Sequence, residues 1–404
     1  MAEQHGKALV PQIRFAGFTD PWEQRKLSDL TDRVSIQSSD SDLPQVEYED
    51  IIPGEGTLNK DLRDKKGGKT GIKFYAGDVL YGKLRPYLMN WLYPQFNGVA
   101  VGDFWVLRAT ECDSSFLYRL VQTGSFQRLA NVSSGSKMPR ADWNLISQSF
   151  FAVPADHAEQ KAIAKGLAEL DSLITLHQRK YDKLCVLKKS MLDKMFPKGG
   201  SLYPEIRFAG FTDPWEQRKL GDCGSAYGGL SGKTKEDFGR GTAKFVPYTN
   251  VFDNPITDSN RLESIEKDSK QNEVRYGDAL FTVSSETPGE VGMSSVWLSD
   301  QPNVYLNSFC FGYRQDGSFD SRYLAYMLRS QNVRSDLTLL AQGISRFNIS
   351  KNKVMELKVP YPGLKEQAQL GAFFDRLDSL ITLHQRKLEL LRNIKKSMLD
   401  KMFV

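Results

Sequence analysis

Cysteine and histidine, the residues that most often build redox, metal and nucleophilic sites, are scarce in this sequence. The 404 residues include four of each. The cysteines, at positions 112, 185, 223 and 310, show no paired spacing, and no cysteine-histidine cluster has the spacing of a zinc site. We therefore expect free thiols in a reducing compartment and no metal site.

Long apolar runs are absent too. No stretch approaches the ~20 apolar residues of a membrane span, and residues 1–10 lack the apolar core of a secretory signal. We therefore expect a cytoplasmic protein. The net charge of +5 permits a polyanionic partner without requiring one.

No familiar catalytic motif is complete. Residues 68–70 and 232–234 both read Gly-Lys-Thr, but a phosphate-binding loop needs an earlier glycine where Arg63 and Tyr227 stand. There is no glycine-rich dinucleotide fingerprint, no Asn-Pro-Pro-aromatic box of amino-methyltransferases and no nucleophile elbow. The acidic residues form no identifiable acid/base pair. The sequence therefore argues against an enzyme.

What the sequence does have is a duplication. Residues 170–180 read LDSLITLHQRK, and residues 377–387 repeat them without a change. KKSMLDKMF follows at 188–196 and again at 395–403, so both segments recur at the same offset of 207 (377 minus 170). An internal repeat of this kind indicates that one structural unit is used twice.

Each copy of this stretch has the periodicity of a long helix. Apolar residues alternate spacings of four and three over several heptads, which makes a seam of a and d positions. Such a seam needs a partner, so we predict an intramolecular antiparallel two-helix coiled coil, each helix about 60 Å long at ~1.5 Å per residue. The seam histidines could fix the register, or could serve a metal or catalytic role. The seam includes Leu170, Ile174, His177, Leu184, Leu377, Ile381, His384 and Leu391.

A second repeat precedes the variable part of each half. Residues 11–30 and 204–223, called the leading segments here, match at seventeen of twenty positions. Asp20 or Asp213 suits a helix N-cap and the following proline suits the first helical position. We predict a short helix there, with Trp22 or Trp215 packing as an apolar anchor.

The variable regions, about 31–153 and 224–360, share little sequence but have the same order of features. Each has a Gly-Asp turn leading into a strand, a short helix, a Gly/Ser loop that carries a base, and a closing strand. We predict a mixed α/β (α+β) fold in which two similar globular domains are separated by the coiled coil and related by a pseudo-twofold repeat. The predicted divisions are 1–153, 154–200, 201–360 and 361–404.

Basic and polar residues interleaved with aromatics on these loops are the candidate DNA contacts. Arginine and asparagine can hydrogen bond base edges bidentately, while lysine and serine suit phosphates. The alternative for any one of them is ordinary solvated loop charge. The candidates are Lys83, Arg85, Tyr87, Lys137, Arg140, Lys233, Asn250, Ser285, Ser345, Arg346 and Asn348.

The chain resembles the specificity subunit of type I restriction-modification systems over its whole length. The resemblance rests on the duplicated Trp-Glu-Gln-Arg-Lys-Leu sequences (22–27 and 215–220), the Gly-Asp turns, and the Glu-Gln pairs at 159–160 and 366–367 that precede the long helices. It implies two target recognition domains, each reading half of a bipartite site in double-stranded DNA. It also implies that the helices dock two methyltransferase subunits, which nuclease subunits join. S-adenosylmethionine, ATP and Mg would bind those partners, and this chain would bind no cofactor.

Three other readings remain open from the residues. A protein–protein scaffold would also use two adaptor domains on a coiled-coil spacer. A specificity subunit of a smaller bifunctional restriction system would have the same architecture. An independent nuclease is a third possibility, but it lacks a metal-site signature.

Overall fold

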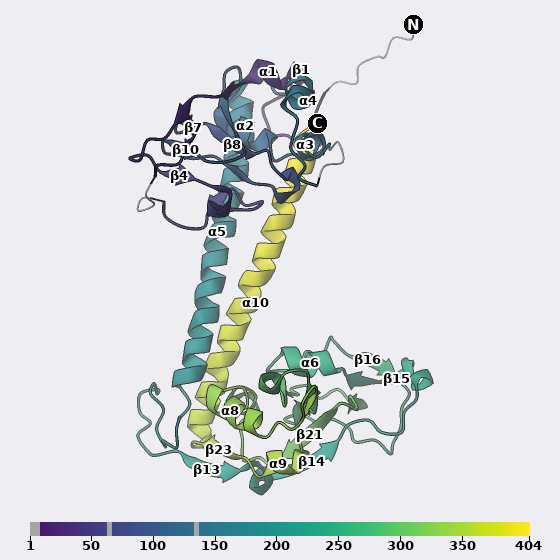
Figure 1. Ribbon diagram of the computed structural model, residues 1–404. Coiled ribbons are helices and arrows are strands. Elements are labelled where there is room, and N and C mark those ends of the chain that lie inside the picture. The colour runs from purple at the N-terminus through teal and green to yellow at the C-terminus, as the bar shows by residue number, and fades with distance from the viewer. Residues whose placement is uncertain (1–8, 63–66, 133–136) are drawn as a thin grey trace. The chain divides into compact units, whose positions relative to one another are not determined.

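The computed structural model describes residues 9–62, 67–132 and 137–404. Arg63 and residues 134–136 of the first predicted Gly/Ser loop lie outside the described residues. The chain divides into two compact units (Figure 1): unit 1 comprises Met1–Arg179 and Gln385–Val404, and unit 2 comprises Lys180–His384.

Unit 1 is built on a four-stranded antiparallel sheet with the order β2-β11-β8-β9. A second four-stranded sheet has the order β3-β7-β10-β4, and β10 and β4 are parallel. β1 pairs with β12, and β5 pairs with β6. The strands are β1 Glu23–Lys26, β2 Thr31–Val34, β3 Gln37–Ser38, β4 Gln45–Val46, β5 Ile51–Ile52, β6 Thr57–Leu58, β7 Gly71–Phe74, β8 Val79–Gly82, β9 Trp91–Leu92, β10 Gly98–Ala100, β11 Phe104–Ala109 and β12 Phe150–Val153. The helices are α1 Leu27–Leu30, η1 Tyr48–Asp50, η2 Pro86–Leu88, α2 Ser114–Leu120, α3 Gly124–Ala130, α4 Trp143–Gln148 and the first part of α5 His157–Lys194.

Unit 2 repeats this plan. Its four-stranded antiparallel sheet has the order β14-β21-β17-β19, and a three-stranded sheet has the order β16-β15-β20 with β15 and β20 parallel. β13 pairs with β23, and β18 pairs with β22. The strands are β13 Glu216–Lys219, β14 Gly224–Gly228, β15 Phe238–Val246, β16 Glu263–Ile265, β17 Ala279–Thr282, β18 Ser284–Ser285, β19 Ser294–Val296, β20 Val304–Leu306, β21 Cys310–Gln315, β22 Phe347–Asn348 and β23 Lys358–Tyr361. The helices are η3 Leu220–Cys223, η4 Lys235–Asp237, α6 Tyr248–Asp253, η5 Pro288–Glu290, α7 Ser321–Met327, α8 Gln331–Leu339, α9 Lys351–Met355, residues 180–194 of α5 and residues 364–384 of α10 Leu364–Lys401.

The two long helices confirm the periodicity of the repeat. α5 and α10 have 38 residues each, which is about 57 Å at ~1.5 Å per residue. Within each unit a stretch of α5 lies antiparallel to a stretch of α10: Lys395 pairs with Asp171 in unit 1, and Lys188 pairs with Asp378 in unit 2. All the residues predicted for the seam are buried or half-buried.

The same polar contacts fasten the leading segment to the long helix in each unit. In unit 1 the guanidinium of Arg14 binds Glu159 at 2.6 Å, and in unit 2 that of Arg207 binds Glu366 at 2.7 Å. Both carboxylates are buried near the start of a long helix, where the helix dipole also favours negative charge. The repeated arginine and glutamate thus form the same ion pair in both units, although the indole N–H of Trp22 also donates to Glu159 and that of Trp215 has no partner among the described residues.

Each tryptophan of the leading segments is a core anchor, as predicted. The ring of Trp22 meets Phe403 edge-on at 6.1 Å, and that of Trp215 meets Phe196 at 6.2 Å. Phe196 and Phe403 close the two repeated KKSMLDKMF segments. The C-terminal end of each long helix is therefore held in a core by a tryptophan.

The predicted short helix at Asp20 and Asp213 is wrong. The residues after Trp22 form β1, which pairs with β12 from Glu23↔Val153 to Lys26↔Phe150. β13 pairs with β23 in the same way, and helical turns begin only at Leu27 and Leu220. Strand pairing with a segment more than a hundred residues away has overridden a favourable local capping sequence.

Candidate functional site

In unit 1, two of the predicted DNA-contacting segments lie beside each other. The chain leaves β8 and forms an antiparallel bridge between Leu84 and Arg140. The amide of Arg85 donates to the carbonyl of Pro139 at 2.7 Å, and the amide of Ala141 donates to that of Lys83 at 2.8 Å. The strand after the Gly-Asp turn and the described end of the Gly/Ser loop therefore form one surface.

A single carboxylate neutralises much of the positive charge on this surface. Asp103, just before β11, accepts from Arg140 at 3.0 Å and lies 3.5 Å from the ammonium of Lys83. Lys137 is exposed, and Arg85 is exposed beside the bridge. Two of the four predicted basic residues are thus held by an acidic residue, and two project without an ion pair among the described residues.

The turn after Arg85 has an unusual backbone. Arg85 and Met89 flank η2 with φ of 49° and 55°, in the left-handed region that non-glycine residues seldom adopt. Pro86 is buried, whereas Tyr87, Leu88 and Met89 are exposed. Strained backbone persists where the surrounding structure enforces it, and it is enriched at binding sites.

Unit 2 brings the equivalent segments together through a short sheet. Ser284 faces Asn348 and Ser285 faces Phe347 in the β18-β22 pair. A pocket of about 390 Å³ opens beside this pair. It is lined by Tyr248, Thr249, Phe252, Ser284, Ser285, Glu286, Glu290, Phe309 and Arg346.

Two predicted contacts, Lys233 and Asn250, do not line this pocket. Asn250 is 0% exposed; its amide donates to the carbonyls of Asp258 and Arg261 and accepts from the amide of Asp258. Lys233 is 13% exposed and bound to Asp268 at 2.8 Å, a pairing that lowers the pKa of that carboxyl. Both side chains hold loops of unit 2 in this structure, and their role as DNA contacts stays a prediction. Ser285 is also buried, and its hydroxyl donates to Glu290 at 3.2 Å.

Two exposed pocket residues, Glu286 and Phe309, are not among the DNA contacts predicted from the sequence, because those were bases, amides, hydroxyls and one tyrosine. The Ser-Ser-Glu-Thr run directly after the second Gly-Asp strand was a usable signal for Glu286.

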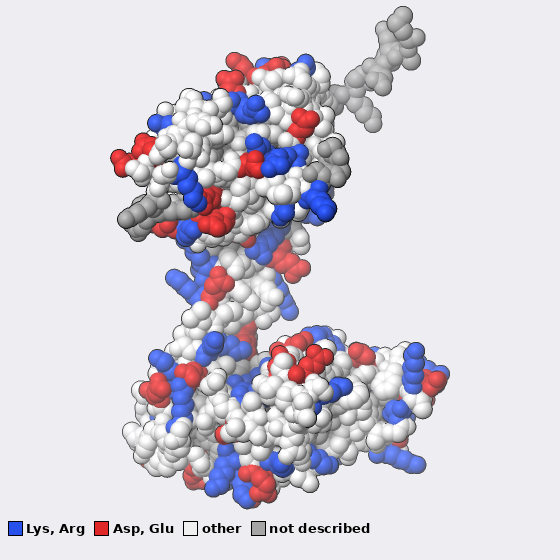
Figure 2. Space-filling model, viewed as in Figure 1, with Lys and Arg blue, Asp and Glu red and all other residues white. Residues whose placement is uncertain are grey.

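Surface charge by itself does not mark this site. Figure 2 shows basic and acidic side chains interspersed on the visible face of each unit, without a large area of one sign. Recognition of a polyanion would therefore depend on individual side chains at the bridged segments.

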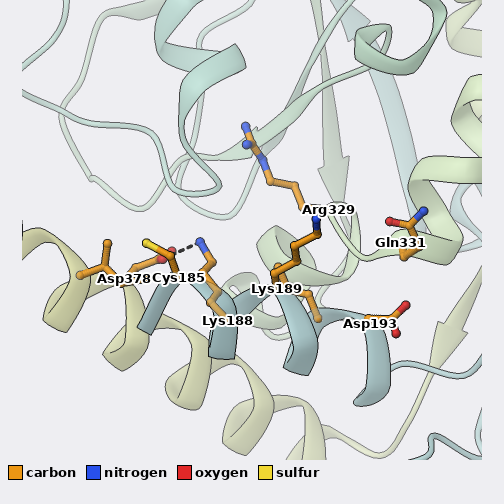
Figure 3. Close-up of a pocket in the computed structure, with 9 residues that line it drawn as sticks. Cys185, Lys188, Lys189, Asp193, Arg329, Gln331 and Asp378 are labelled. Carbon is orange, nitrogen blue, oxygen red and sulfur yellow. Dashed lines mark ion pairs between the residues drawn. The ribbon is translucent and has the colours of Figure 1, made fainter. Parts of the chain in front are cut away.

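A second hollow, of about 400 Å³, lies in unit 2 beside the end of α5 (Figure 3). Lys188 pairs there with Asp378 at 2.5 Å, and the hydroxyl of Tyr326 donates to the other oxygen of that carboxylate at 2.9 Å. Burial, followed by the nearby Asp378 charge, raises the pKa of Tyr326, so its hydroxyl stays a donor. The ion pair belongs to the helix seam, and we assign the hollow a structural role.

The same helices expose large aliphatic side chains beside the seam. In unit 1 these are Leu173, Leu176, Leu390 and Ile394. In unit 2 they are Leu380, Leu383, Val186 and Leu187. Most occupy the c and g positions of the heptads, which lie on the same side of a helix.

Within the described residues no group of three or more histidine, cysteine, aspartate or glutamate side chains could hold a metal ion. The four cysteines are unpaired, and burial raises the pKa of Cys112 and Cys310 to about 12. In the same part of the chain, every helix is too short or too polar to cross a membrane.

Comparison with known proteins points one way. A family model described as the type I restriction modification DNA specificity domain matches residues 212–393. The type I restriction enzyme MjaVIII specificity subunit of Methanocaldococcus jannaschii is 24% identical over 296 residues, covering 71% of this chain and 68% of that relative.

Solved structures share the fold. The S subunit of a type I restriction-modification system from M. genitalium has a TM-score of 0.56 at 13% identity, covering 98% of this chain and 99% of that one. A chain from a study of complex assembly and conformational transition of the type I R-M system has a TM-score of 0.52 at 18% identity, covering 94% and 97%. The similarity extends through both units and both long helices.

Proposed function

This chain belongs to the specificity subunits of type I restriction-modification systems, and from that premise we propose that each unit reads one half of a bipartite DNA site. One observation carries the proposal. The segment after the Gly-Asp strand is bridged to the Gly/Ser loop in both units, at Leu84↔Arg140 and at Ser284↔Asn348. A four-stranded antiparallel sheet recurs in both units, while the side chains on the bridges differ. That is the arrangement expected of two readers with separate specificities.

The proposed contacts in unit 1 are Lys83, Arg85, Tyr87, Lys137 and Arg140. In unit 2 they are Ser345, Arg346 and Asn348, which are exposed. Arginine suits guanine edges and asparagine suits adenine edges, while lysine suits phosphates. Glycine and serine in the loops allow the backbone to approach the duplex closely.

The test is the methylated sequence in cells that express this chain with its methyltransferase subunit. We expect a motif of two short specific blocks separated by a gap without preference. A single continuous motif would contradict two independent readers. No motif, together with no DNA binding by the purified complex, would favour the scaffold function instead.

The helices are proposed to dock two methyltransferase subunits, one on the aliphatic face in each unit. Leu173 and Leu176 lie within the same eleven-residue sequence as Leu380 and Leu383. Exposed aliphatic side chains gathered on one face mark an interaction surface. Two identical sequences would bind two copies of one partner, and nuclease subunits would join that complex.

Replacing Leu380 and Leu383 together by aspartate should leave one methyltransferase subunit bound, and replacing all four leucines should leave none. Native mass spectrometry of the purified complex measures the stoichiometry. Leu339→Asp is the matched control, since Leu339 is 82% exposed on α8 of unit 2 and lies outside the long helices. Two subunits bound to the fourfold variant would remove the proposed docking face.

We also propose that this chain is not itself an enzyme. No acid/base pair or nucleophile is assembled at either bridged surface of the described residues. S-adenosylmethionine, ATP and Mg would bind the partner subunits. Methyl transfer from labelled S-adenosylmethionine by the purified chain should equal the blank. Turnover that survives further purification would overturn this assignment.

A further inference from the structure

The second Gly/Ser loop is a pinned hairpin that projects from unit 2. Gln342 and Asn348 exchange two backbone hydrogen bonds, of 2.9 and 2.8 Å, at its base. Gly343 has φ +140°, and a Cβ there would collide with the carbonyl oxygen of Arg346. The turn therefore requires glycine at this position, and its closure fixes the direction of the next three residues.

The tip of the hairpin is an isoleucine in open solvent. Ile344 is 97% exposed, the highest value among the exposed large hydrophobic residues of the described chain. Single exposed aliphatic residues are common, but one held at the end of a pinned turn has a fixed direction. Ile344 lies two residues before Arg346, which lines the pocket beside β18 and β22.

At the rim of that pocket, a base and an acid stand near each other without forming an ion pair. Arg346 and Glu286 both line the pocket and both are exposed. Neither takes part in an ion pair or side-chain hydrogen bond among the described residues. Glu290, by contrast, already accepts from Ser285 and from Thr287 at 2.9 Å.

A free carboxylate on a surface that faces DNA has one favourable use. It is repelled by phosphates, but it can accept a hydrogen bond from an exocyclic amine, as glutamate does from N4 of cytosine. The guanidinium beside it can donate to O6 and N7 of guanine. Both groups lie in the major groove, as does the methyl group of thymine, which aliphatic side chains contact.

We propose that the Gln342–Asn348 hairpin enters the major groove of the second half-site, where Arg346 and Glu286 read a G·C pair or adjacent guanine and cytosine, and Ile344 contacts a thymine methyl. This rests on the proposed function, since it names the side chains and bases used by one of the two readers. It assigns specificity to an acidic and an apolar residue as well as to a basic one.

The experiment selects duplexes from a pool randomised over both half-sites, using this chain in complex with its methyltransferase subunit. The variants are Arg346→Lys, Glu286→Gln and Ile344→Ala. Each should lower discrimination at one position of the second half-site and leave the first half-site unchanged, and the loss should be about 5- to 150-fold for Arg346, the proposed bidentate contact. Leu339→Ala is the control, because it removes another highly exposed aliphatic side chain (82%) elsewhere in unit 2 and should change nothing.

The thymine contact has its own test. Replacing the selected thymine by deoxyuridine removes only the methyl group, so it should weaken binding by the unmodified chain and have no further effect on Ile344→Ala. Equal weakening in both proteins would overturn the isoleucine assignment.

The outcomes separate the two proposals. If the unmodified complex selects no sequence, the proposed function fails. If it selects a bipartite site and the three variants keep the same preferences, the function stands and the hairpin assignment is overturned. A uniform loss of affinity without a change in preference would place the hairpin on phosphates and would also overturn base reading. All three residues are exposed, and unchanged thermal melting of each variant checks that it folds.

Discussion

In both units a backbone bridge joins the segment after the Gly-Asp strand to the Gly/Ser loop, but the charged side chains at the two bridges are paired differently. In unit 1, Asp103 binds both Lys83 and Arg140, so part of the basic surface is neutralised from within. In unit 2, Arg346 and Glu286 stand at the pocket rim without such a partner. The contrast teaches that two variable regions with little sequence in common form similar backbone bridges, whereas their individual residues decide which polar groups remain available for binding.

The joint between the sheet domain and the long helix shows the same principle inside the fold. Asp171 binds Lys395 at 2.7 Å and Arg119 at 2.6 Å, while Asp378 binds Lys188 and the hydroxyl of Tyr326. The aspartate and the lysine belong to the repeat. The second partner of each aspartate comes from the variable region. It is the guanidinium of Arg119 in unit 1 and the neutral phenol of Tyr326 in unit 2.

The largest expected effect comes from exchanging one whole reader. Replacing residues 31–150 by the corresponding region of a relative should change the first half-site entirely, because the frame is shared and the bridged side chains are not. Sequencing of methylated DNA measures the result. A changed second half-site would show that the units do not read independently and would break the comparison.

Arg329 in unit 2 and its counterpart in unit 1 should contribute differently to the stability of the two units. Arg329 donates to the carbonyls of Ser294, Val251, Phe252 and Asn254, and burial lowers its pKa to about 10, so it remains charged at neutral pH. Arg329→Ala removes four hydrogen bonds to part-buried carbonyls and should cost about 3–5 kcal/mol.

The equivalent residue in unit 1 is Gln122, at the same offset of 207 (329 minus 122). Gln122→Ala should cost only about 1 kcal/mol, since its amide nitrogen is unpaired. Hydrogen exchange resolved by segment should show loss of protection around 247–254 for the arginine variant. Similar losses for both variants would mean that Arg329 does not brace these loops.

Replacing the repeated aspartates, Asp171 and Asp378, should also destabilise the two units to different extents. Asp171→Asn leaves two cations, one of them the buried Arg119, without an anion, and should destabilise unit 1 by about 2–4 kcal/mol. Asp378→Asn leaves one lysine and a phenol that can still donate to the amide, so about 1–2 kcal/mol is expected in unit 2. Denaturant-dependent hydrogen exchange of each unit compares the two. The reverse order would contradict the role given to the second partner.

The smallest expected effect comes from replacing Asp103, which pairs with two basic residues at the bridged surface of unit 1. Asp103→Asn removes one negative charge beside Lys83 and Arg140, and should raise affinity for random duplex DNA a few-fold while steepening the salt slope by about one. Binding titrations of the methyltransferase complex at several salt concentrations give both numbers. Asp253→Asn, which frees Arg261 in unit 2 from its exposed ion pair, is the matched control for an added positive charge away from the bridge. Equal effects would show that only net charge matters.

Much of this protein could be predicted from its sequence because repetition and periodicity are local signals. The heptad spacing determined both long helices, since apolar residues at a and d positions must share a face whatever else the chain does. The duplicated leading segments determined that two similar units exist. The closing strands at β12 and β23 and the short helices α2 and α7 also lie where the sequence predicts them.

Tertiary structure alone decided the rest, because it depends on partners that are distant in the sequence. The Asp20 segment has good helix-capping residues, yet pairing with Phe150–Val153 makes it continue as a strand. The sequence offers Asn250 as an amide that could contact DNA, yet in the structure its side chain is hydrogen bonded to the loop around Asp258. Whether a basic residue is free to meet DNA depends on a carboxylate such as Asp103, which no local pattern connects to Arg140. Sequence supplies the candidate groups, and only folding determines which of them have already found a partner.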